Sequence, residues 1–220
     1  MTAGRPDPTR DGAQTGTVPT APGPAGDHGA AVRSGPDDRM RCLWAASTPE
    51  YLVYHDTEWG RPLHGADALY ERLCLEAFQS GLSWLTILRK RPAFRRAFDG
   101  FAIDRVAAFG DADVARLLGD ASIVRNRAKI EASIHNARVA ADLDVGLDDL
   151  LWSFAPRPPQ TRPVTMADLP AVTDESRAMA RELKRLQFKF IGPTTAYALM
   201  QATGMVDDHV VDCWRAGDSR

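Results

Sequence analysis

The sequence predicts an all-α fold, a bundle of helices formed by the chain from about residue 40 onward. From Ala66 onward nearly every segment carries apolar residues at helical spacing, and no long run alternates between apolar and polar residues as a half-buried strand does. Some segments, such as residues 111–118, begin with an aspartate, which the helix dipole favours at a helix start. The chain shows no internal repeat, so these helices are expected to form a single domain.

The first 39 residues are predicted to be a disordered tail. Residues 1–38 contain no Leu, Ile or aromatic residue and are rich in Pro, Gly, Ala, Thr and Asp. Such a segment buries too little apolar surface to offset the entropy lost on ordering, and it lacks the apolar central run of a secretory signal peptide. We therefore expect a helical domain over residues 40–220, whose roughly 180 residues suffice to bury a core.

Helical periodicity, read in chain order, gives the expected elements of this domain. The proline-rich residues 155–163 cannot be helical and are predicted to be a surface connection. Residues 79–83, Gln-Ser-Gly-Leu-Ser, separate the first two helices. The expected helices cover residues 67–78, 84–90, 103–109, 111–118, 124–143, 147–154, 174–186 and 194–203.

Composition excludes several classes of protein. A formal net charge of −2 shows no overall signature of nucleic-acid binding, although it permits local basic patches. The three cysteines, Cys42, Cys74 and Cys213, are too few and too scattered for a disulfide framework, which indicates a reducing cytoplasm. No stretch is long and uncharged enough to span a membrane. No exposed heptad seam is present, so a monomer is expected.

Two residues beside the 79–83 break are unusual for a plain core. Glu76 lies inside an apolar run, where a buried carboxylate requires a hydrogen bond or an opposite charge. Trp84 follows eight residues later, just after the break. These residues alone leave two interpretations open: Glu76 faces water and Trp84 belongs to the core, or both belong to a site.

Four possible metal ligands lie at the two ends of the predicted domain, Cys42 and His55 near its start and His209 and Cys213 near its end. A Cys2His2 set satisfies tetrahedral zinc and leaves no open position, so a zinc ion here would be structural and would tie the two ends together. The spacing matches no zinc-finger pattern, and two buried cysteines with two ordinary histidines remain an alternative. Cys74 is interpreted as a small buried hydrophobe.

Residues 186–196 join the last two helices through a short turn with Gly192 at its bend. Gly192 can adopt a positive φ, and Pro193 and Thr194 suit the first turn of the following helix. The N–H groups at such a helix start bind anions and commonly contact DNA phosphates without reading the base sequence. An ordinary corner between helices is the alternative. Basic residues lie beside the turn: Lys184, Arg185 and Lys189.

Together these motifs resemble the DNA-3-methyladenine glycosylase I family, a branch of the helix-hairpin-helix DNA repair glycosylases. The resemblance spans about residues 41–214 and leaves the predicted tail outside, and the combination is far more specific than any one motif. It is carried by Arg-Cys-Leu-Trp at 41–44, Tyr-His-Asp-Thr-Glu-Trp-Gly at 54–60, Leu-Glu at 75–76 with Gly-Leu-Ser-Trp at 81–84, Phe-Lys-Phe-Ile-Gly at 188–192, and Asp-His-Val-Val at 208–211 followed by Cys213.

The resemblance implies a helix-hairpin-helix glycosylase-type helical bundle that acts on double-stranded alkylated DNA in the cytoplasm, at the nucleoid. It implies one structural Zn²⁺ per chain, held by Cys42, His55, His209 and Cys213. A pocket for the flipped base would be lined by Trp44, Tyr54, Glu76 and Trp84. The DNA contacts would be a wedge at Gly81 and Leu82 and a phosphate site at Lys189, Gly192 and Thr194.

The implied chemistry suits these residue types. A base is flipped out of the duplex before it is cleaved, and a damaged, poorly paired base costs least to extrude. A 3-methylated adenine is cationic, so the faces of Trp84 and Tyr54 attract it, and Glu76 can accept hydrogen bonds from its amino edge. Cleavage passes through an oxocarbenium-like state with water as the final nucleophile. No lysine stands near the far end of the hairpin to form a Schiff base. A monofunctional enzyme that leaves an abasic site is therefore expected.

Two positions depart from the wider superfamily. Phe190 stands where a second glycine is usual, and Asp207 stands two residues before His209, at the place of a catalytic aspartate that this branch is usually described as lacking. We hypothesise that Asp207 stabilises the sugar cation, with a solvated carboxylate at a helix start as the alternative. Two other functions compete with the glycosylase: a non-catalytic zinc-stapled DNA-binding module, and a zinc hydrolase, against which a closed four-ligand site argues.

Overall fold

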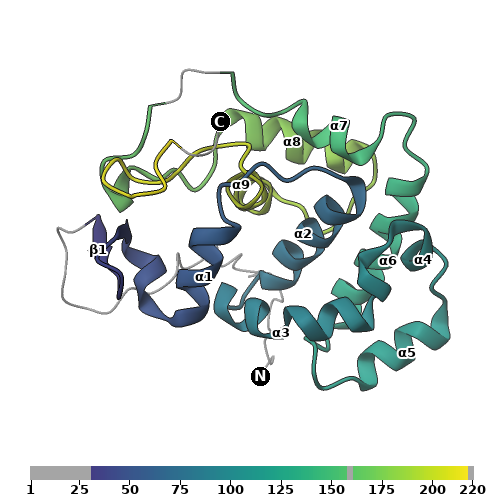
Figure 1. Ribbon diagram of the computed structural model, residues 1–220. Coiled ribbons are helices and arrows are strands. Elements are labelled where there is room, and N and C mark those ends of the chain that lie inside the picture. Colours follow the sequence, from purple (N-terminus) through teal and green to yellow (C-terminus); the bar gives the residue numbers. More distant parts are fainter. Residues whose placement is uncertain (1–30, 158–160, 218–220) are drawn as a thin grey trace, which may run out of the picture.

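The computed structural model describes residues 31–157 and 161–217, and this part of the chain is mostly helical (Figure 1). None of the described helices is long and apolar enough to cross a membrane. The α-helices are α1 (Pro49–Thr57), α2 (Ala66–Gln79), α3 (Trp84–Ala97), α4 (Ile103–Ala107), α5 (Asp111–Gly119), α6 (Arg127–Ala141), α7 (Leu147–Trp152), α8 (Asp174–Arg185) and α9 (Pro193–Ala202). Short 3₁₀ helices are η1 (Leu43–Ser47), η2 (Asp99–Phe101) and η3 (Met166–Asp168).

A small antiparallel sheet precedes the helices and corrects two predictions. Strand β1 (Val32–Ser34) pairs with β2 (Met40–Cys42), with Val32 opposite Cys42. The predicted tail therefore extends too far along the chain, since its residues 31–39 contain β1 and the turn to β2. Residues 1–30 of that tail lie outside the described residues. The fold is also not purely helical. The backbone N–H of Trp214 donates to the Met40 carbonyl oxygen at 2.8 Å, which holds the C-terminal segment beside this hairpin.

The predicted helices are present, with ends that shift by up to seven residues, the largest shift being that of α3, which continues to Ala97 beyond the expected end at residue 90. Helix α6 begins at Arg127 rather than at residue 124 because Asn126 caps it, its side-chain oxygen accepting from the Lys129 N–H at 3.1 Å. Helix α1 was not predicted, although Thr48 accepts from the Tyr51 N–H at 3.2 Å in the manner of an N-cap. The described residues of the 155–163 connection contain no helix, and residues 158–160 lie outside the described ones.

Helix α2 is buried on all sides. Every residue from Leu69 to Phe78 is buried, including the charged side chains of Glu71, Arg72 and Glu76. Helix α9 lies in the middle of the molecule in Figure 1 and packs against α2 and α8. Because α2 has no solvent-facing side over this length, its polar residues must find partners inside the protein or serve a site.

A buried lysine determines how α2 ends. The Lys129 ammonium on α6 donates to the carbonyl oxygens of Phe78 at 3.0 Å and Ser80 at 2.6 Å. The last carbonyls of a helix have no partner within the helix, and a cation is favourable beside them. Gly81 then turns the chain at φ 81°, and α3 starts at Trp84. Lys129 therefore sets where Trp84 stands relative to Glu76.

The turn between α8 and α9 differs from its prediction in detail. Gly192 has an extended backbone at φ −87°, whereas Gln187 and Phe190 take positive φ values of 72° and 62°. Phe190, at the place where the wider superfamily usually has glycine, therefore adopts the conformation that glycine favours. Asn136 of α6 bonds both backbone groups of Lys189, at 2.8 Å and 3.0 Å, which fixes this turn against the bundle.

The Lys129→Met variant is expected to lower the free energy of unfolding by about 1–3 kcal/mol, because the buried Phe78 carbonyl and the partly buried Ser80 carbonyl lose their donor. Urea denaturation measures the change. Lys90→Met is the matched control, since Lys90 also donates to two carbonyls, of Ala121 and Ser122, but at the surface; its effect should stay within about 0.5 kcal/mol. Equal losses in the two variants would contradict the role given to Lys129.

Candidate functional site

A cavity of about 220 Å³ lies among η1, α1, α2, α3 and α9. The four predicted base-binding residues, Trp44, Tyr54, Glu76 and Trp84, all line it. They come from four different elements, so only the folded chain brings them together. The complete lining consists of Trp44, Tyr51, Tyr54, Trp59, Glu76, Gln79, Trp84, Met166, Leu169, Ala198, Gln201 and Ala202.

Aromatic rings in mutual contact form the walls of this cavity. The Trp44 ring packs edge-on against the Tyr51 ring, with ring centroids 5.6 Å apart. The ring centroids of Tyr54 and Trp84 are 5.5 Å apart. The Leu85 N–H donates to the Tyr51 hydroxyl at 3.0 Å, which joins α3 to α1. Large rings held by one another and by a hydrogen bond lose little freedom when a ligand enters. The walls are therefore preorganised for a flat ligand.

Glu76 is the acidic residue of the cavity. Its side chain is 6% exposed, so the interpretation that Glu76 faces water is wrong. Among residues 31–157 and 161–217, no group donates a hydrogen bond to its carboxylate. Burial raises the pKa of Glu76 to about 7, and Arg72, one turn earlier on α2, acts in the opposite direction. The cavity thus presents a buried acceptor to whatever enters it.

Three of the four predicted metal ligands form one cluster. The ligand atoms of Cys42, His55 and Cys213 all lie within 4.8 Å of one another, and all three residues are buried. The His55 Nε2 is 3.4 Å from the Cys213 sulfur. A hydrogen bond from Cys42 lowers the pKa of the Cys213 thiol, so the pair readily presents a thiolate. This is a possible metal-ligating group of soft donors.

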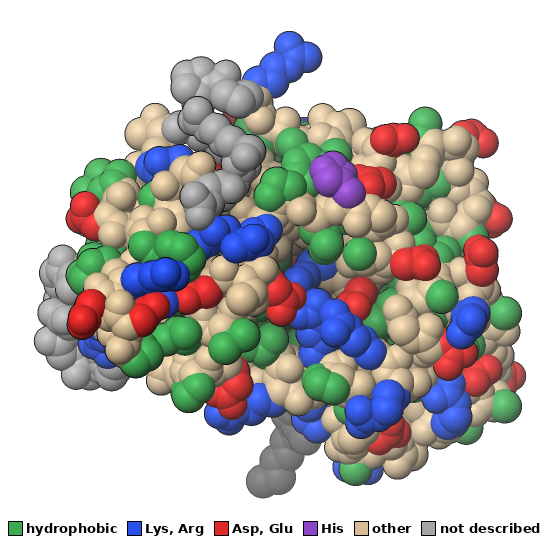
Figure 2. Space-filling view, in the orientation of Figure 1, with side chains coloured by type: hydrophobic (Ala, Val, Ile, Leu, Met, Phe, Trp, Pro, Cys, Tyr) green, Lys and Arg blue, Asp and Glu red, His purple; other side chains and the backbone are tan. Residues whose placement is uncertain are grey.

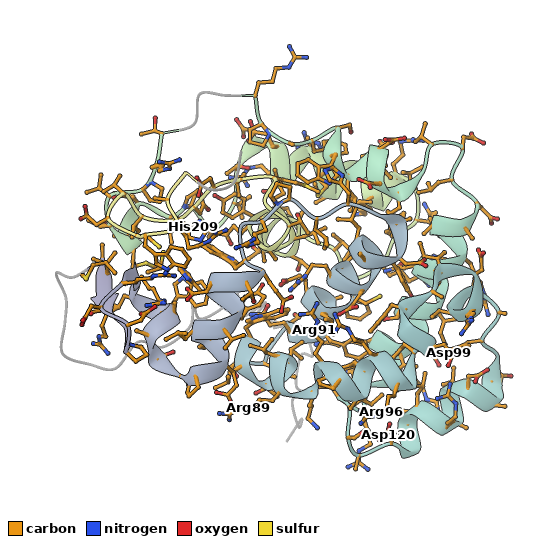
Figure 3. All side chains as sticks on the ribbon, viewed as in Figure 1. Arg89, Arg91, Arg96, Asp99, Asp120 and His209 are labelled. Carbon is orange, nitrogen blue, oxygen red and sulfur yellow. The ribbon has the colours of Figure 1, made fainter. Side chains whose placement is uncertain are left out.

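His209 lies beside this cluster without being part of the close group. Its ring centroid is 5.0 Å from that of His55, and Figure 3 labels it among the C-terminal loops. Its Nε2 is buried and has no hydrogen-bond partner among the described residues. A Cβ atom on Gly60 would lie 2.5 Å from the His209 Cε1 atom, so only glycine permits this ring to pack where it does.

A carboxylate orients each of these two imidazoles. Asp56 lies 2.9 Å from the Nδ1 of His55, and Asp207 lies 2.9 Å from the Nδ1 of His209. Because an ionised carboxylate only accepts hydrogen bonds, Nδ1 carries the proton in each ring and Nε2 keeps its lone pair. This is the arrangement of metal-binding histidines, whose other ring nitrogen donates to a carboxylate. The donor set fits zinc.

The structure places Asp207 with His209 and away from the cavity lining. Its Oδ1 bonds the His209 ring, and its Oδ2 accepts from Arg162 at 3.0 Å and from the Gly217 N–H at 3.2 Å. It is not among the residues that line the cavity with Glu76. These contacts favour a structural role for Asp207 and give no support to the hypothesis that it stabilises a sugar cation.

The predicted DNA-contacting residues are exposed in two turns. Gly81 and Leu82 occupy the turn from α2 to α3, between the cavity residues Gln79 and Trp84, and Leu82 is 41% exposed. This turn is therefore part of the cavity rim. In the turn from α8 to α9, Lys189, Gly192 and Thr194 are all exposed.

Several lining residues were missed by sequence reasoning. Tyr51 stands three residues before Tyr54 on the same helix, so helical spacing could have found it. Trp59 lies within the 54–60 motif itself. No local sequence pattern pointed to Gln201, because only the packing of α9 brings it to the cavity. Its side-chain amide donates to Asp208 at 2.8 Å.

The Glu76→Gln variant should be more stable than the unchanged protein at pH 8. The folded-state pKa of Glu76, about 7, lies above its ordinary value of 4.5, so the ionised group destabilises the fold. This destabilisation is complete above about pH 7 and vanishes below about pH 4.5. At pH 8 we expect a gain of up to about 3 kcal/mol, and at pH 4.5 none.

Urea denaturation at the two pH values tests this expectation. Glu131→Gln on the exposed face of α6, where Glu131 pairs with Arg127 at 3.2 Å, is the matched control and should show no pH-dependent gain. A Glu76→Gln difference that is the same at pH 4.5 and pH 8 would show that the carboxylate is not held at a raised pKa.

Comparison with known proteins agrees with this geometry. The sequence model of the family described as Methyladenine glycosylase matches residues 44–216. Over 177 residues the chain is 44% identical to DNA-3-methyladenine glycosylase 1 of Escherichia coli strain K12, an alignment that covers 79% of this chain and 95% of that protein. The chain is also 38% identical to a DNA-3-methyladenine glycosylase of Haemophilus influenzae, in an alignment that covers 79% of this chain and 96% of that protein.

Solved structures give the same result. A crystal structure of 3-methyladenine DNA glycosylase I matches with a TM-score of 0.76 at 42% identity, covering 79% of this chain and 98% of that one. A variant of 3-methyladenine DNA glycosylase I in complex with 3-methyladenine matches with a TM-score of 0.77 at 33% identity. This match covers 82% of this chain and 99% of that one. From its fold, its cavity and its sequence, the chain belongs to the methyladenine glycosylase family.

Proposed function

We propose that this protein is a monofunctional DNA repair glycosylase that flips 3-methyladenine out of alkylated double-stranded DNA and hydrolyses its N-glycosidic bond, leaving an abasic site. The observation that carries the proposal is the buried Glu76 carboxylate, which faces an aromatic cavity and accepts no hydrogen bond from the described residues. An unpaired buried acceptor is costly, and a cationic ligand with N–H donors removes that cost.

Recognition rests on charge as well as shape. The rings of Tyr54 and Trp84 present electron-rich faces, which attract a cationic purine beyond ordinary stacking. Glu76 accepts hydrogen bonds from the amino edge of the base and complements its positive charge. Normal adenine lacks that charge, and its pairing in the duplex makes it more costly to extrude. The same cavity therefore discriminates against undamaged DNA.

Cleavage of the glycosidic bond needs little chemistry from the protein. A cationic purine is already a good leaving group, and the bond breaks through an oxocarbenium-like state that water captures. Glu76 stabilises the positive charge and holds the base in the reactive orientation. No lysine is among the described residues that line the cavity, which favours hydrolysis over a Schiff-base pathway.

The two exposed turns are assigned to the DNA. Leu82, an exposed apolar residue at the cavity rim, enters the base stack as the flipped base leaves it. The start of α9, with Gly192 and Thr194, offers backbone N–H groups to a phosphate, and the Lys189 side chain adds a positive charge. Extrusion and capture of the base thus take place on neighbouring surfaces of one domain.

We assign one structural zinc ion per chain to Cys42, His55, His209 and Cys213. When bound, it cross-links β2 and α1 to the C-terminal segment. Asp56 and Asp207 orient the two imidazoles, and Trp59 contacts both rings while it lines the cavity. The four-ligand set leaves no position for water, which argues against a zinc hydrolase.

The first test is release of free 3-methyladenine from methylated duplex DNA. The unchanged protein should release it, and Glu76→Gln should lower the rate by at least about a hundredfold, in the range of lost general acid–base or charge-stabilising groups. Glu131→Gln should keep the full rate. If the zinc-loaded, unchanged protein binds DNA but releases no base, it is the non-catalytic zinc-stapled DNA-binding module.

Zinc content tests the ligand assignment. Elemental analysis should give about one zinc per chain, and removal by a chelator should lower the melting temperature, because metal binding energy is folding energy. Cys213→Ser and His209→Ala should each weaken zinc binding. His64→Ala, at an exposed histidine that pairs with Asp148, should not. A His209→Ala variant that holds zinc as tightly as the unchanged protein would remove His209 from the set.

A further inference from the structure

A buried arginine lies directly behind the cavity walls. Arg72 is 3% exposed and stands one turn before Glu76 on α2. Its guanidinium carbon is 5.5 Å from the Tyr54 ring centroid and 5.9 Å from that of Trp84. One nitrogen donates to the Tyr54 hydroxyl at 3.3 Å, while the buried Nε has no hydrogen-bond partner among the described residues. Two cavity side chains, Tyr54 and Trp84, therefore lie against this cation, and a third, Glu76, stands one turn away.

Arg72 is also the inner end of an ion-pair network. It pairs with Glu58 at 3.0 Å, Glu58 also pairs with Arg91, and Glu71 pairs with both Arg91 and Arg95. Figure 3 shows Arg91 near the middle of the molecule, where basic and acidic side chains gather in Figure 2. Three arginines in this network face two carboxylates. Arg72, at the inner end of this network, stands one turn from Glu76, which accepts no hydrogen bond from the described residues.

We propose that Arg72 is a positioning residue that holds Glu76 in its anionic form in the cavity and so makes the site competent for a cationic base. The role in base recognition rests on the proposed function, whereas the coupling of Arg72 to Glu76 does not. Residues at i and i+4 of a helix are neighbours, and a charge pair shielded from water interacts more strongly than one at the surface. The direction of the Glu76 pKa supports the pairing, since burial raises it and Arg72 alone opposes the rise.

Other charges near Glu76 do not replace Arg72. From α1 and its end come Tyr54 and Glu58, and Arg91 on α3 is shared between two carboxylates. The ammonium of Lys129 on α6 is bound to the carbonyls that end α2. Helix α9, η1 and the segment around η3 contribute only uncharged residues to the cavity lining. Arg72 is therefore the cation on which the Glu76 carboxylate depends.

Titration of Glu76 in the full-length, zinc-loaded protein tests the coupling directly. The ¹³C resonance of the labelled Glu76 carboxyl group gives the midpoint. We expect Arg72→Met to raise this midpoint by at least about one pH unit and Arg72→Lys to keep it near that of the unchanged protein. Arg95→Met, at the exposed end of the network, should leave it unchanged. An unchanged midpoint in folded Arg72→Met, or equal midpoints in the Met and Lys variants, would overturn the proposal.

A second variant covers the case in which Arg72→Met does not fold. Glu58→Gln retains Arg72 and removes its competing partner, so the Glu76 midpoint should move in the opposite direction, to lower pH. A midpoint that rises or stays constant in Glu58→Gln would equally overturn the proposal.

The pH profile of 3-methyladenine release from methylated duplex DNA separates positioning from a merely structural role. In Arg72→Met the release rate should fall at least about fivefold at pH 7, since a midpoint one unit above about 7 leaves about a tenth of Glu76 ionised instead of about half, and it should recover as the pH is raised past the new midpoint. A loss that is independent of pH would contradict the proposal, as would a gain in rate at pH 7. If the unchanged protein releases no base while the titration behaves as expected, the proposed function fails and the coupling stands.

Discussion

The burial of α2 from Leu69 to Phe78 is the constraint on which the site depends. A helix enclosed on every side cannot turn a polar residue toward water, so each charged group on it must be paired inside the protein or left for a ligand. Glu71 and Arg72 are paired, and Lys129 satisfies the carbonyls at the helix end. Glu76 accepts no hydrogen bond from the described residues. The packing of one helix thus produces the chemical feature that distinguishes this cavity from an ordinary apolar pocket.

The clustered ends of the domain support the same cavity from the other side. Cys42 and His55 come from the start of the folded chain and Cys213 from its end, and the rings of Trp44 and Trp59 lie against His55 while they line the cavity. A cross-link at this cluster would hold those rings in position. The role of such a cross-link in function would be indirect, through the rigidity of an aromatic wall, and it would need no open coordination site.

Function and stability oppose each other at Glu76. A buried carboxylate without a hydrogen bond weakens the folded state, and the structure retains it where a cationic base would provide the missing donors. Such sites are common in enzymes, where groups needed for binding are held in arrangements that do not favour the free protein. The ion-pair network behind Tyr54 and Trp84 reduces that cost by placing a buried guanidinium one turn from the carboxylate.

Much of this organisation was available from the sequence alone. Helical periodicity and capping residues are local signals, so the helices from α2 to α9 and the break at residues 79–83 could be predicted, and the resemblance identified Trp44, Tyr54, Glu76 and Trp84 as a group. Helix α1 and strand β1 were missed, the latter because three residues become a strand only when Cys42 and its neighbours pair with them.

Only the tertiary structure decided the contacts between distant residues. It placed Asp207 on His209 and Arg162 rather than beside Glu76, brought Gln201 to the cavity, and surrounded Arg72 with Tyr54, Trp84 and Glu58. These contacts join residues separated along the chain by anything from two positions to more than a hundred. The sequence determined which residues form helices because that depends on near neighbours, whereas the partner of each buried charge depends on how the helices pack.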